Sequence, residues 1–349
     1  MKYLVVVSFL AFLTTNINAQ SGQRSVLSKD QLDYYLIQSF IARDSTKRIP
    51  LNHVGLQGQQ KNKGFLVTSV LEGYPAHAAG INRGDIIETV NGEPFHPINS
   101  FNPERDASGK FSPNLRENTL SLTRAGVNQN ISIAAVYENL FDSYRSATSN
   151  SVLEFSAGNK IIGYIRFWGL SRGSNEIINY QMLVKDLGHT DGIIFDFRDS
   201  FGFLGPEHLD LVFPNQNNSN ALQNISNFTD SSRSIFLKSQ IKPYRKPIAL
   251  LLNEGTRGGA ELFAYQLDKL ERVVSVGEST KGMIGRFNFE GAADDSDITY
   301  ASDEALLIDG QSLESLGVKP ERIIFYPYEN TTRGDPQFEA AINILLGII

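Results

Sequence analysis

The spacing of hydrophobic residues changes along the chain and predicts two kinds of structure. Up to residue 137, short apolar runs are separated by Gly, Pro and Asn, as in small antiparallel sheets. Asn91-Gly92 is a strong hairpin-turn signal, and Ala125-Gly126 predicts a second turn. The runs predict a short helical turn over 75–79 and strands over 65–70, 85–90, 120–123 and 131–136.

From residue 160 onward, continuous apolar runs alternate with segments of helical spacing. Continuous runs are typical of parallel strands that are buried on both faces. They predict strands over 161–167, 192–197, 247–252 and 272–276, and helices over 175–187 and 260–270. This alternation indicates an α/β layer architecture.

Three further segments complete the pattern. Residues 30–43 have roughly helical spacing and predict a short amphipathic helix. Residues 1–19 have a lysine, an apolar run and a small residue for cleavage at Ala19, as in a secretory signal. Residues 215–229 are rich in Asn, Ser and Gln and predict a solvated loop. We therefore expect an exported protein, periplasmic or secreted, with no membrane span after the signal is removed.

Composition narrows the chemistry. The chain has no cysteine, which excludes disulfides, thiolate metal sites and cysteine catalysis. Its five histidines are not spaced as zinc ligands, and we expect neither a metal nor a cofactor. The net charge of −6 argues against nucleic acid as a partner, because phosphates favour a basic surface.

The segment from Gly64 to Phe95 resembles a PDZ domain of the type found in bacterial proteases, and its part GYPAHAAGINRGDIIETVNG, residues 73–92, carries the pattern. The resemblance implies that Val54, Gly55 and Leu56 form a loop that binds the carboxylate of a peptide or protein C-terminus. Successive backbone N–H groups suit that task. The peptide is then expected to add as a strand beside residues 65–70. The alternative is a PDZ domain that serves only as a spacer.

The region from Lys160 to the C-terminus resembles the core of the carboxyl-terminal processing, or tail-specific, serine proteases. The matching pieces, in order, are IIGYIRFWGL, DGIIFDFRDSFGF, LLNEGTRGGAELFAYQLDKLERVVSVGESTKGMIG, LESLGVKPERII and RGDPQFEAAINILL. The resemblance implies an α/β protease core of the crotonase-like type with a small β-rich PDZ domain. The expected division is a signal peptide at 1–19, a helical segment at 20–49, the PDZ domain at 50–137 and the core at 138–349.

The resemblance also locates the catalytic positions, and their residues have changed. The family's serine lies three residues before a glutamate, here Glu261, so the nucleophile position is Gly258. The position of the family's lysine base is Met283. Neither residue can perform its step, because acyl transfer needs a nucleophile and a base within reach.

The surroundings of the dyad have changed as well. The resemblance implies that Gly202 and Gly259 lie near the oxyanion hole. A second family glycine beside this hole is replaced by Phe203, and a frequent glutamine by Phe287. A bulky ring at residue 203 should restrict the approach of a substrate backbone.

A relocated dyad is the main alternative to inactivity. Thr256 and Lys281 each lie two residues before a vacated position. In an extended chain, a shift of two residues keeps the side chain on the same face and moves it by about 6.6 Å. Otherwise Thr256 fills a small turn position and Lys281 is solvated. For the neighbours, we expect Arg257 to be solvated rather than to bind a carboxylate, and Arg198 and Asp199 to shape the turn. Trp168 is expected in the core or lining the groove, and His77 at the surface.

Three functions are consistent with these residues. The first is an exported, peptide-binding pseudoprotease that captures chain termini through the PDZ domain or holds a partner in the vacated cleft. The second is an active serine- or threonine-type endopeptidase with a rearranged site. The third is an adaptor that uses the fold only as an interaction surface. A peptidase assay separates the second from the others, and peptide binding separates the first from the third.

Overall fold

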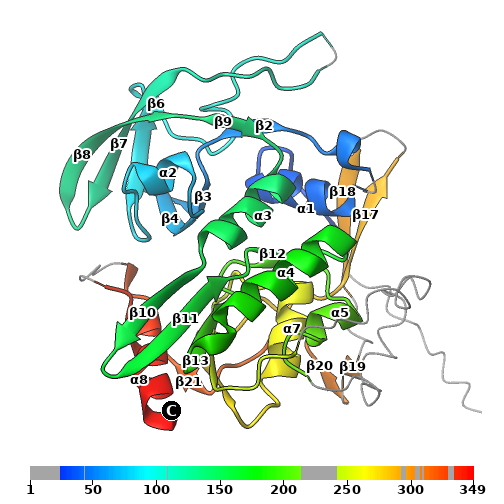
Figure 1. The fold of residues 1–349 in the computed structure, drawn as a ribbon. Helices are drawn as coiled ribbons and strands as arrows, with labels where there is room; N and C mark the ends of the chain where they lie inside the picture. Colours follow the sequence, from blue (N-terminus) through cyan, green and yellow to red (C-terminus); the bar gives the residue numbers. More distant parts are fainter. Residues whose placement is uncertain are drawn as a thin grey trace, which may run out of the picture.

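The computed structural model describes residues 24–42, 44–107, 109–213, 242–291, 296–302, 307–308, 310–328 and 334–349. The predicted signal at 1–19 and the predicted polar loop at 215–229 lie outside these residues. Figure 1 shows two main sheets, one within residues 153–323 and one within residues 56–134, and helix α3 (Leu140–Asn150) runs from the second toward the first. The α/β fold with a small β-rich domain is confirmed.

The first main sheet, formed within residues 153–323, has six strands in the order β10, β11, β13, β15, β16 and β21. Neighbours are parallel except for the antiparallel pair of β10 and β11. The loops that leave the carboxyl ends of β15 and β16 carry Gly258 and Met283, so both lie at the edge where α/β sheets bind ligands. The strands are β10 (Leu153–Ala157), β11 (Lys160–Arg166), β13 (Gly192–Asp196), β15 (Ile248–Leu252), β16 (Val273–Gly277) and β21 (Arg322–Ile323).

Helices cover both faces of this sheet. Ile194 and Leu251 pack toward α8 (Pro336–Ile348), whereas Phe195 and Leu250 pack toward the opposite helices. The alternation explains why the strands are continuously apolar, since both faces are buried. The helices of the second face and its loops are α4 (Ser174–Asp186), α5 (Pro206–Leu209), α7 (Gly259–Leu267) and η2 (Leu187–His189).

The second sheet, formed within residues 56–134, also has six strands, in the order β3, β4, β5, β7, β8, with β6 paired to β5. Asn91 (φ 51°) and Gly92 (φ 87°) turn the predicted hairpin, and Ala125 (φ 49°) and Gly126 (φ 79°) turn the next. Positive φ at both central residues is what such two-residue turns require. The elements are β3 (Leu56–Lys61), β4 (Gly64–Val70), α2 (Pro75–Ala78), β5 (Ile86–Val90), β6 (Glu93–Pro94), β7 (Glu117–Arg124) and β8 (Val127–Ala134).

One expectation for this sheet is wrong. Strand β4, residues 64–70, pairs with β3 on one side and β5 on the other, so no peptide can add beside it. The free edge on this side belongs to β3. The sequence could not separate the two strands, because the polar run of β3 carries little strand signal.

The N-terminal segment is tied to the protease-like core. The predicted helix is α1 (Leu32–Ile41), and it is preceded by β1 (Arg24–Val26), which the sequence did not predict. Strand β1 extends a small sheet in the order β1, β18, β17. The remaining elements are η1 (Ser45–Lys47), β2 (Leu51–His53), β9 (Val136–Glu138), β12 (Gly169–Leu170), β14 (Phe201–Gly202), β17 (Arg286–Glu290), β18 (Asp297–Ala301), β19 (Leu307–Ile308) and β20 (Gln311–Ser312).

Candidate functional site: a vacated catalytic turn and an open groove

The predicted nucleophile position lies on the turn from β15 to α7. Gly258 caps the helix with φ 65° and ψ −132°, a conformation that glycine adopts without a side-chain penalty. α/β-Hydrolases place their nucleophile on a strained strand-to-helix turn of this kind. The backbone geometry that presents a nucleophile is therefore present, while the nucleophile itself is absent.

The space above Gly258 is almost filled. Gly202 and Gly259 lie beside Gly258, as predicted, and together they border a cavity of about 10 Å³. A cavity of this size holds at most one water molecule. The expectation that a partner could occupy the vacated cleft is therefore wrong.

Three phenylalanines account for the lost space. Phe201, Phe203 and Phe287 all border the cavity. The ring centroid of Phe201 lies 5.7 Å from that of Phe203 and 5.6 Å from that of Phe287. Phe40 of α1 adds a fourth ring at 5.4 Å from Phe201. The rings meet edge to face, a favourable aromatic arrangement, and the partly exposed Phe203 and Phe287 pack against the buried Phe201 beside the turn.

The loop after β16 is fixed by a buried carboxylate from α7. Glu261 is fully buried and accepts hydrogen bonds from the Thr280 hydroxyl, from the Gly282 N–H (2.7 Å) and from the Met283 N–H (3.0 Å). Burial raises the pKa of Glu261, and the three hydrogen bonds oppose that rise. Glu261 is thus a structural residue that positions this loop.

Met283 contacts the vacated turn through its backbone. Its carbonyl oxygen accepts the Gly258 N–H at 3.0 Å. The next two N–H groups of the loop donate to Glu314 and to the Tyr300 hydroxyl. The two positions of the predicted dyad are therefore adjacent, as the resemblance implied, but they meet through main-chain atoms alone.

Thr256 and Lys281 do not form a substitute dyad. Thr256 is fully buried, and its hydroxyl donates to the Phe197 carbonyl at 2.8 Å and accepts the Asn253 N–H at 3.2 Å. Lys281 is exposed and contacts Thr256 through its own N–H, which donates to the Thr256 carbonyl at 2.9 Å. The threonine hydroxyl shapes the turn, and neither side chain borders the small cavity.

The expectation that Arg257 is solvated is wrong. Its side chain is 9% exposed and pairs with Asp33 of α1, with the nitrogen and oxygen 2.6 Å apart. Its guanidinium also lies 5.5 Å from the Phe201 ring centroid. No local pattern predicts this contact, because Asp33 is more than two hundred residues away along the chain. Helix α1 is clamped over the vacated site by this ion pair and by Phe40.

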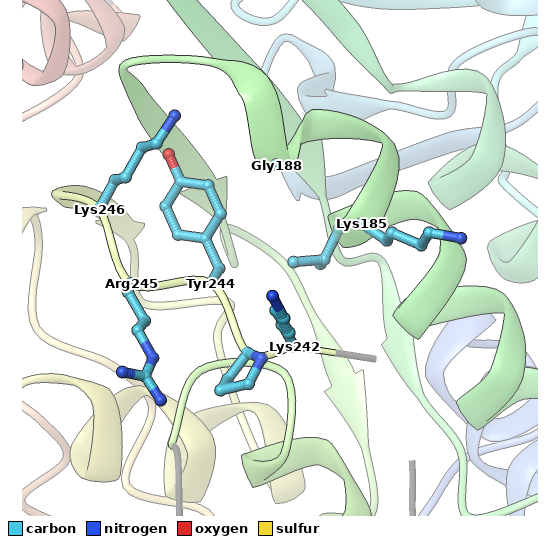
Figure 2. A pocket seen from close by; sticks show the side chains of 8 residues that line it. Lys185, Gly188, Lys242, Tyr244, Arg245 and Lys246 are labelled. Carbon is cyan, nitrogen blue, oxygen red and sulfur yellow. The ribbon is translucent and has the colours of Figure 1, made fainter. Parts of the chain in front are cut away.

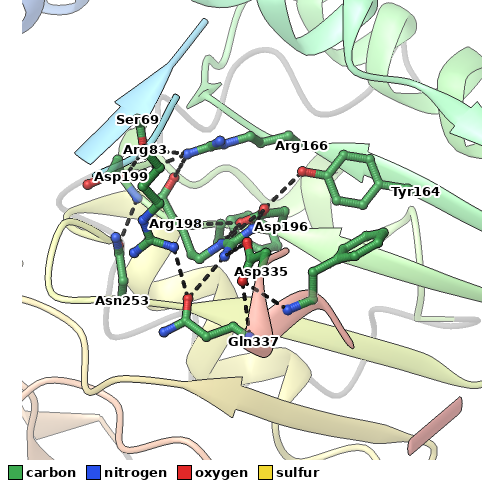
Figure 3. Close-up of polar contacts among 12 residues, drawn as sticks. Ser69, Arg83, Tyr164, Arg166, Asp196, Arg198, Asp199, Asn253, Asp335 and Gln337 are labelled. Atoms are coloured by element: carbon green, nitrogen blue, oxygen red, sulfur yellow. Dashed lines mark hydrogen bonds and ion pairs between the residues drawn. The ribbon is translucent and has the colours of Figure 1, made fainter. Parts of the chain in front are cut away.

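Arg198 and Asp199 belong to a buried ionic network, drawn in Figure 3. Arg198 pairs with Asp196 at 2.6 Å and also with Asp335, which caps α8. Burial opposes ionisation of Asp196, but the guanidinium groups of Arg198 and Arg166 outweigh it and hold its pKa well below the usual range. The expected structural role of Arg198 is confirmed.

The same network joins the second sheet to the core. Asp199 contacts Ser69 of β4 and lies 3.6 Å from Arg166. Arg166 donates to the Ser69 hydroxyl at 2.7 Å and lies over the ring of Trp168, which is fully buried. Trp168 in turn donates to Glu72, which follows β4. The two parts of the molecule are therefore fixed together by desolvated charges.

A groove of about 750 Å³ runs beside the free edge of β3. Gln57 to Gln60 form one wall, Asp30 and Asp33 contribute to another, and Phe95 and His96 also line it. Val54 and Leu56 are buried, 2% and 6% exposed, and with Gly55 they lie before the groove begins. His77 is exposed, as expected.

Comparisons with known proteins agree with these features. Residues 161–324 match the profile of peptidase family S41, and residues 41–107 match that of the PDZ domain. The carboxy-terminal processing protease CtpA of Bacillus subtilis is 25% identical over 281 residues, which cover 80% of this chain. The carboxyl-terminal-processing protease of Synechocystis is 24% identical over 315 residues, 85% of this chain and 69% of that protein.

Residues 161–324 therefore carry an S41 peptidase region, and the chain resembles the carboxyl-terminal processing proteases of that family. It spans only 57% of the length of the Bacillus subtilis relative. Among solved structures, a protein assigned to the S41 proteases of Bacteroides fragilis superposes with a TM-score of 0.51 at 15% identity, over 95% of this chain and 87% of that one. This last similarity supports the S41 fold.

Other features of this S41 chain carry no catalytic candidate. In the described residues no helix is long and apolar enough to cross a membrane, and no three His, Asp or Glu side chains gather as metal ligands. A cavity of about 930 Å³ is bordered by Lys185, Lys242, Arg245 and Lys246, as Figure 2 shows. None of the residues that line this basic cavity belongs to the vacated turn or to the groove.

Proposed function

We propose that this S41 protein is a catalytically inactive peptide-binding protein. The observation that carries the proposal is the contrast between a cavity of about 10 Å³ at the vacated turn and a groove of about 750 Å³ along β3. Peptide and ligand sites in proteins have volumes of several hundred Å³, so of these two sites only the groove can admit a chain.

Two further observations support inactivity. Gly258 supplies no nucleophile, and a Cβ added to Gly258 would lie 3.4 Å from the Phe201 ring. The alternative endopeptidase needs Thr256 as nucleophile, but its hydroxyl is fully buried and already engaged on both sides. An activated nucleophile must reach both the base and the substrate carbonyl. We therefore favour the inactive form over the rearranged enzyme.

The free edge of β3 supports peptide binding. An unpaired strand edge binds an extended chain through main-chain hydrogen bonds, and flanking pockets select side chains. The PDZ match makes a chain terminus one candidate ligand, with Val54, Gly55 and Leu56 as the carboxylate loop. An adaptor without a peptide site is the third possibility, and it predicts that the groove stays empty.

Location outside the cytoplasm is part of the proposal. It is supported by the short apolar run that ends at Ala19. N-terminal sequencing of the protein recovered from its native host tests it. A mature protein that begins near Gln20 is expected, and one that retains Met1 contradicts export by this signal.

The decisive experiment pairs two assays on the purified protein. Cleavage of an unstructured protein substrate should be undetectable, and extended peptides should bind with measurable affinity. Cleavage that both Thr256→Ala and Lys281→Ala abolish would establish a relocated dyad and overturn the proposal. Absence of both cleavage and binding would favour the adaptor.

A further inference from the structure

The groove beside β3 and the loop before β3 are separated in the structure. The groove begins at Gln57, and Val54, Gly55 and Leu56 are not among the residues that line it. All three loop residues are buried. A peptide that lies in the groove along β3 therefore does not reach the loop that PDZ domains use for a terminal carboxylate.

Internal hydrogen bonds occupy the backbone of this loop. The Gly55 N–H donates to His53 Nδ1 at 3.2 Å, and the Gly55 carbonyl accepts the Leu71 N–H at 2.9 Å. A Cβ on Gly55 would lie 2.5 Å from the Cβ of Tyr74, so the Tyr74 side chain closes directly over the glycine. Of the successive N–H groups that would hold a carboxylate, the one on Gly55 already has an internal acceptor.

A relay of hydrogen bonds keeps that acceptor in place. Because Nδ1 of His53 accepts, we assign the proton of the neutral ring to Nε2, which then donates to the Ser143 hydroxyl at 3.0 Å. Ser143 donates to Glu138 at 2.7 Å, and the Tyr74 hydroxyl donates to the same carboxylate oxygen at 2.6 Å. Opening the loop would leave buried polar groups of this relay unsatisfied, which is costly.

The charges along the groove disfavour a carboxylate. Asp30 and Asp33 lie in its wall, and the described lining residues include neither lysine nor arginine. Asp33 is already paired with Arg257, whereas Asp30 is exposed and receives a hydrogen bond from the Ser28 hydroxyl. The side-chain amide of Gln59 on β3 donates a hydrogen bond to the Glu254 carboxylate at 3.2 Å, so a further acidic group lies next to this strand. A cationic side chain is complementary to this groove.

We propose that the β3 groove binds extended, chain-internal segments that carry a basic side chain, and that it does not require a free C-terminus. This inference rests on the proposed peptide-binding function and specifies its ligand. The sealed loop removes the preference for a terminal carboxylate, and Asp30 supplies the preference for a positive charge.

The register of β3 identifies the backbone groups that face the groove. Val67 of β4 directs its N–H to Asp85 and accepts the Gly84 N–H, so it does not bond to its partner Gly58. Residues two apart along an antiparallel ladder have the same orientation. Gln60, which is opposite Phe65, therefore also points its N–H and carbonyl toward the free edge. A proline at this position removes an edge donor without removing a ladder hydrogen bond.

Peptides blocked at both ends provide the main test. A ten-residue segment with one central lysine, acetylated and amidated, is compared with the same peptide bearing a free C-terminus, by isothermal titration calorimetry. We expect affinities equal within about twofold, since an exposed like charge contributes little. Replacing the lysine by glutamine should weaken binding by up to about fivefold, the range of an exposed ion pair.

Two protein variants test the wall and the edge. Asp30→Asn retains the acceptor for Ser28 and should abolish the difference between the lysine and glutamine peptides. Gln60→Pro should weaken binding about tenfold, the range of one lost hydrogen bond, whereas Gln60→Ala should not change it. If Gln60→Pro fails to fold, peptides N-methylated at alternate residues test the same edge contacts with the natural protein.

The outcomes separate this inference from the proposed function. Binding of the free-acid peptide alone would overturn the inference and leave the peptide-binding function standing. Binding of neither peptide would overturn the function itself. Equal affinity for lysine and glutamine peptides would overturn the selection of a basic side chain. Binding that Lys242→Glu or Arg245→Glu changes would place the peptide in the basic cavity and also overturn the inference.

Discussion

The vacated turn and the β3 groove lie on the same chain, yet one has about 10 Å³ of free space and the other about 750 Å³. At the turn, Gly258 presents no side chain and three phenylalanines border the small cavity. At the groove, polar side chains and, among the described residues, an unpaired strand edge are accessible. A packed turn and an open groove thus coexist in one molecule, and the proposed inactive, peptide-binding function rests on that contrast.

The largest expected effect concerns catalysis at the turn. Loss of the nucleophile alone lowers the turnover of a serine hydrolase roughly a million-fold, so the natural protein should show no peptidase activity. Gly258→Ser should also be inactive, and so should Gly258→Ser with Met283→Lys. A Cβ on residue 258 lies 3.0 Å from the Gly202 carbonyl oxygen, which is tight, and the cavity has no room for a substrate carbonyl.

Adding Phe203→Gly to that pair sharpens the test. The ring of Phe203 borders the cavity, so its removal creates space beside the predicted oxyanion donors. Weak cleavage of an unstructured substrate by the triple variant alone would support steric closure as the second barrier. Activity of Gly258→Ser by itself would contradict the view that both base and space are missing.

The second effect concerns stability at the turn. Phe201 is fully buried and contacts Phe40, Phe203 and Phe287. Phe201→Ala should lower the free energy of unfolding by about 3–5 kcal/mol, because large-to-small substitutions in a packed core leave a cavity. Phe325, which is 74% exposed, is the matched control, and its alanine variant should stay within about 0.5 kcal/mol. Equal effects in chemical denaturation would show that the cleft is not packed as core.

The third effect is a loss of stability in mild acid. Burial lowers the pKa of His53 and that of His208 to about 4, below the ordinary value near 6.5. Between pH 6.5 and 4 the unfolded chain binds protons that the folded chain does not, so stability falls as the pH falls through that window. Each histidine should contribute roughly 3 kcal/mol to the loss.

Glutamine at each position isolates this contribution. Denaturation midpoints measured from pH 7 to pH 4 should fall less steeply for His53→Gln and for His208→Gln than for the natural protein. Below pH 4 the histidine effect should level off, and protonation of Asp196 should begin to matter only in stronger acid, since its pKa is depressed. A pH profile that neither substitution flattens would contradict the burial of neutral histidines.

The sequence predicted most strands and the tight turns of both sheets because their signals are local, but it did not predict β3 or β10. The apolar run at 248–252 and the pair Asn91-Gly92 specify a buried strand and a tight turn without reference to distant residues. It also predicted that Gly202, Gly258 and Gly259 lie together, through the order of matched segments. The ionic contact between Arg257 and Asp33 escaped prediction, because only the folded chain brings these residues together.

The closure of the site had a partial signal in the sequence. The sequence indicates Phe203 as a bulky replacement near the oxyanion hole and Phe287 as the replacement of a family glutamine, but the contributions of Phe40 and Phe201 depend on how α1 packs. The sequence predicted peptide binding beside residues 65–70, whereas the edge strand is β3. The strand β3, LQGQQK, alternates only weakly in polarity, and its pairing follows from the hairpin with β4. Tertiary packing decides which strand is last in a sheet, and local patterns do not report it.

The smallest expected effects separate a structural threonine from a catalytic one. Thr256→Ala should lower the free energy of unfolding by about 1–3 kcal/mol, because it leaves the buried Phe197 carbonyl and the Asn253 N–H without that hydroxyl. Lys281→Ala should change stability by less than about 0.5 kcal/mol, since the side chain is exposed and its backbone contact is retained. Peptide affinity of the β3 groove should be unaffected in both variants, because neither residue lines it. A relocated dyad predicts a different pair of results. Thr256→Ala would leave the free energy of unfolding unchanged, and Thr256→Ala and Lys281→Ala would lower the peptidase activity equally.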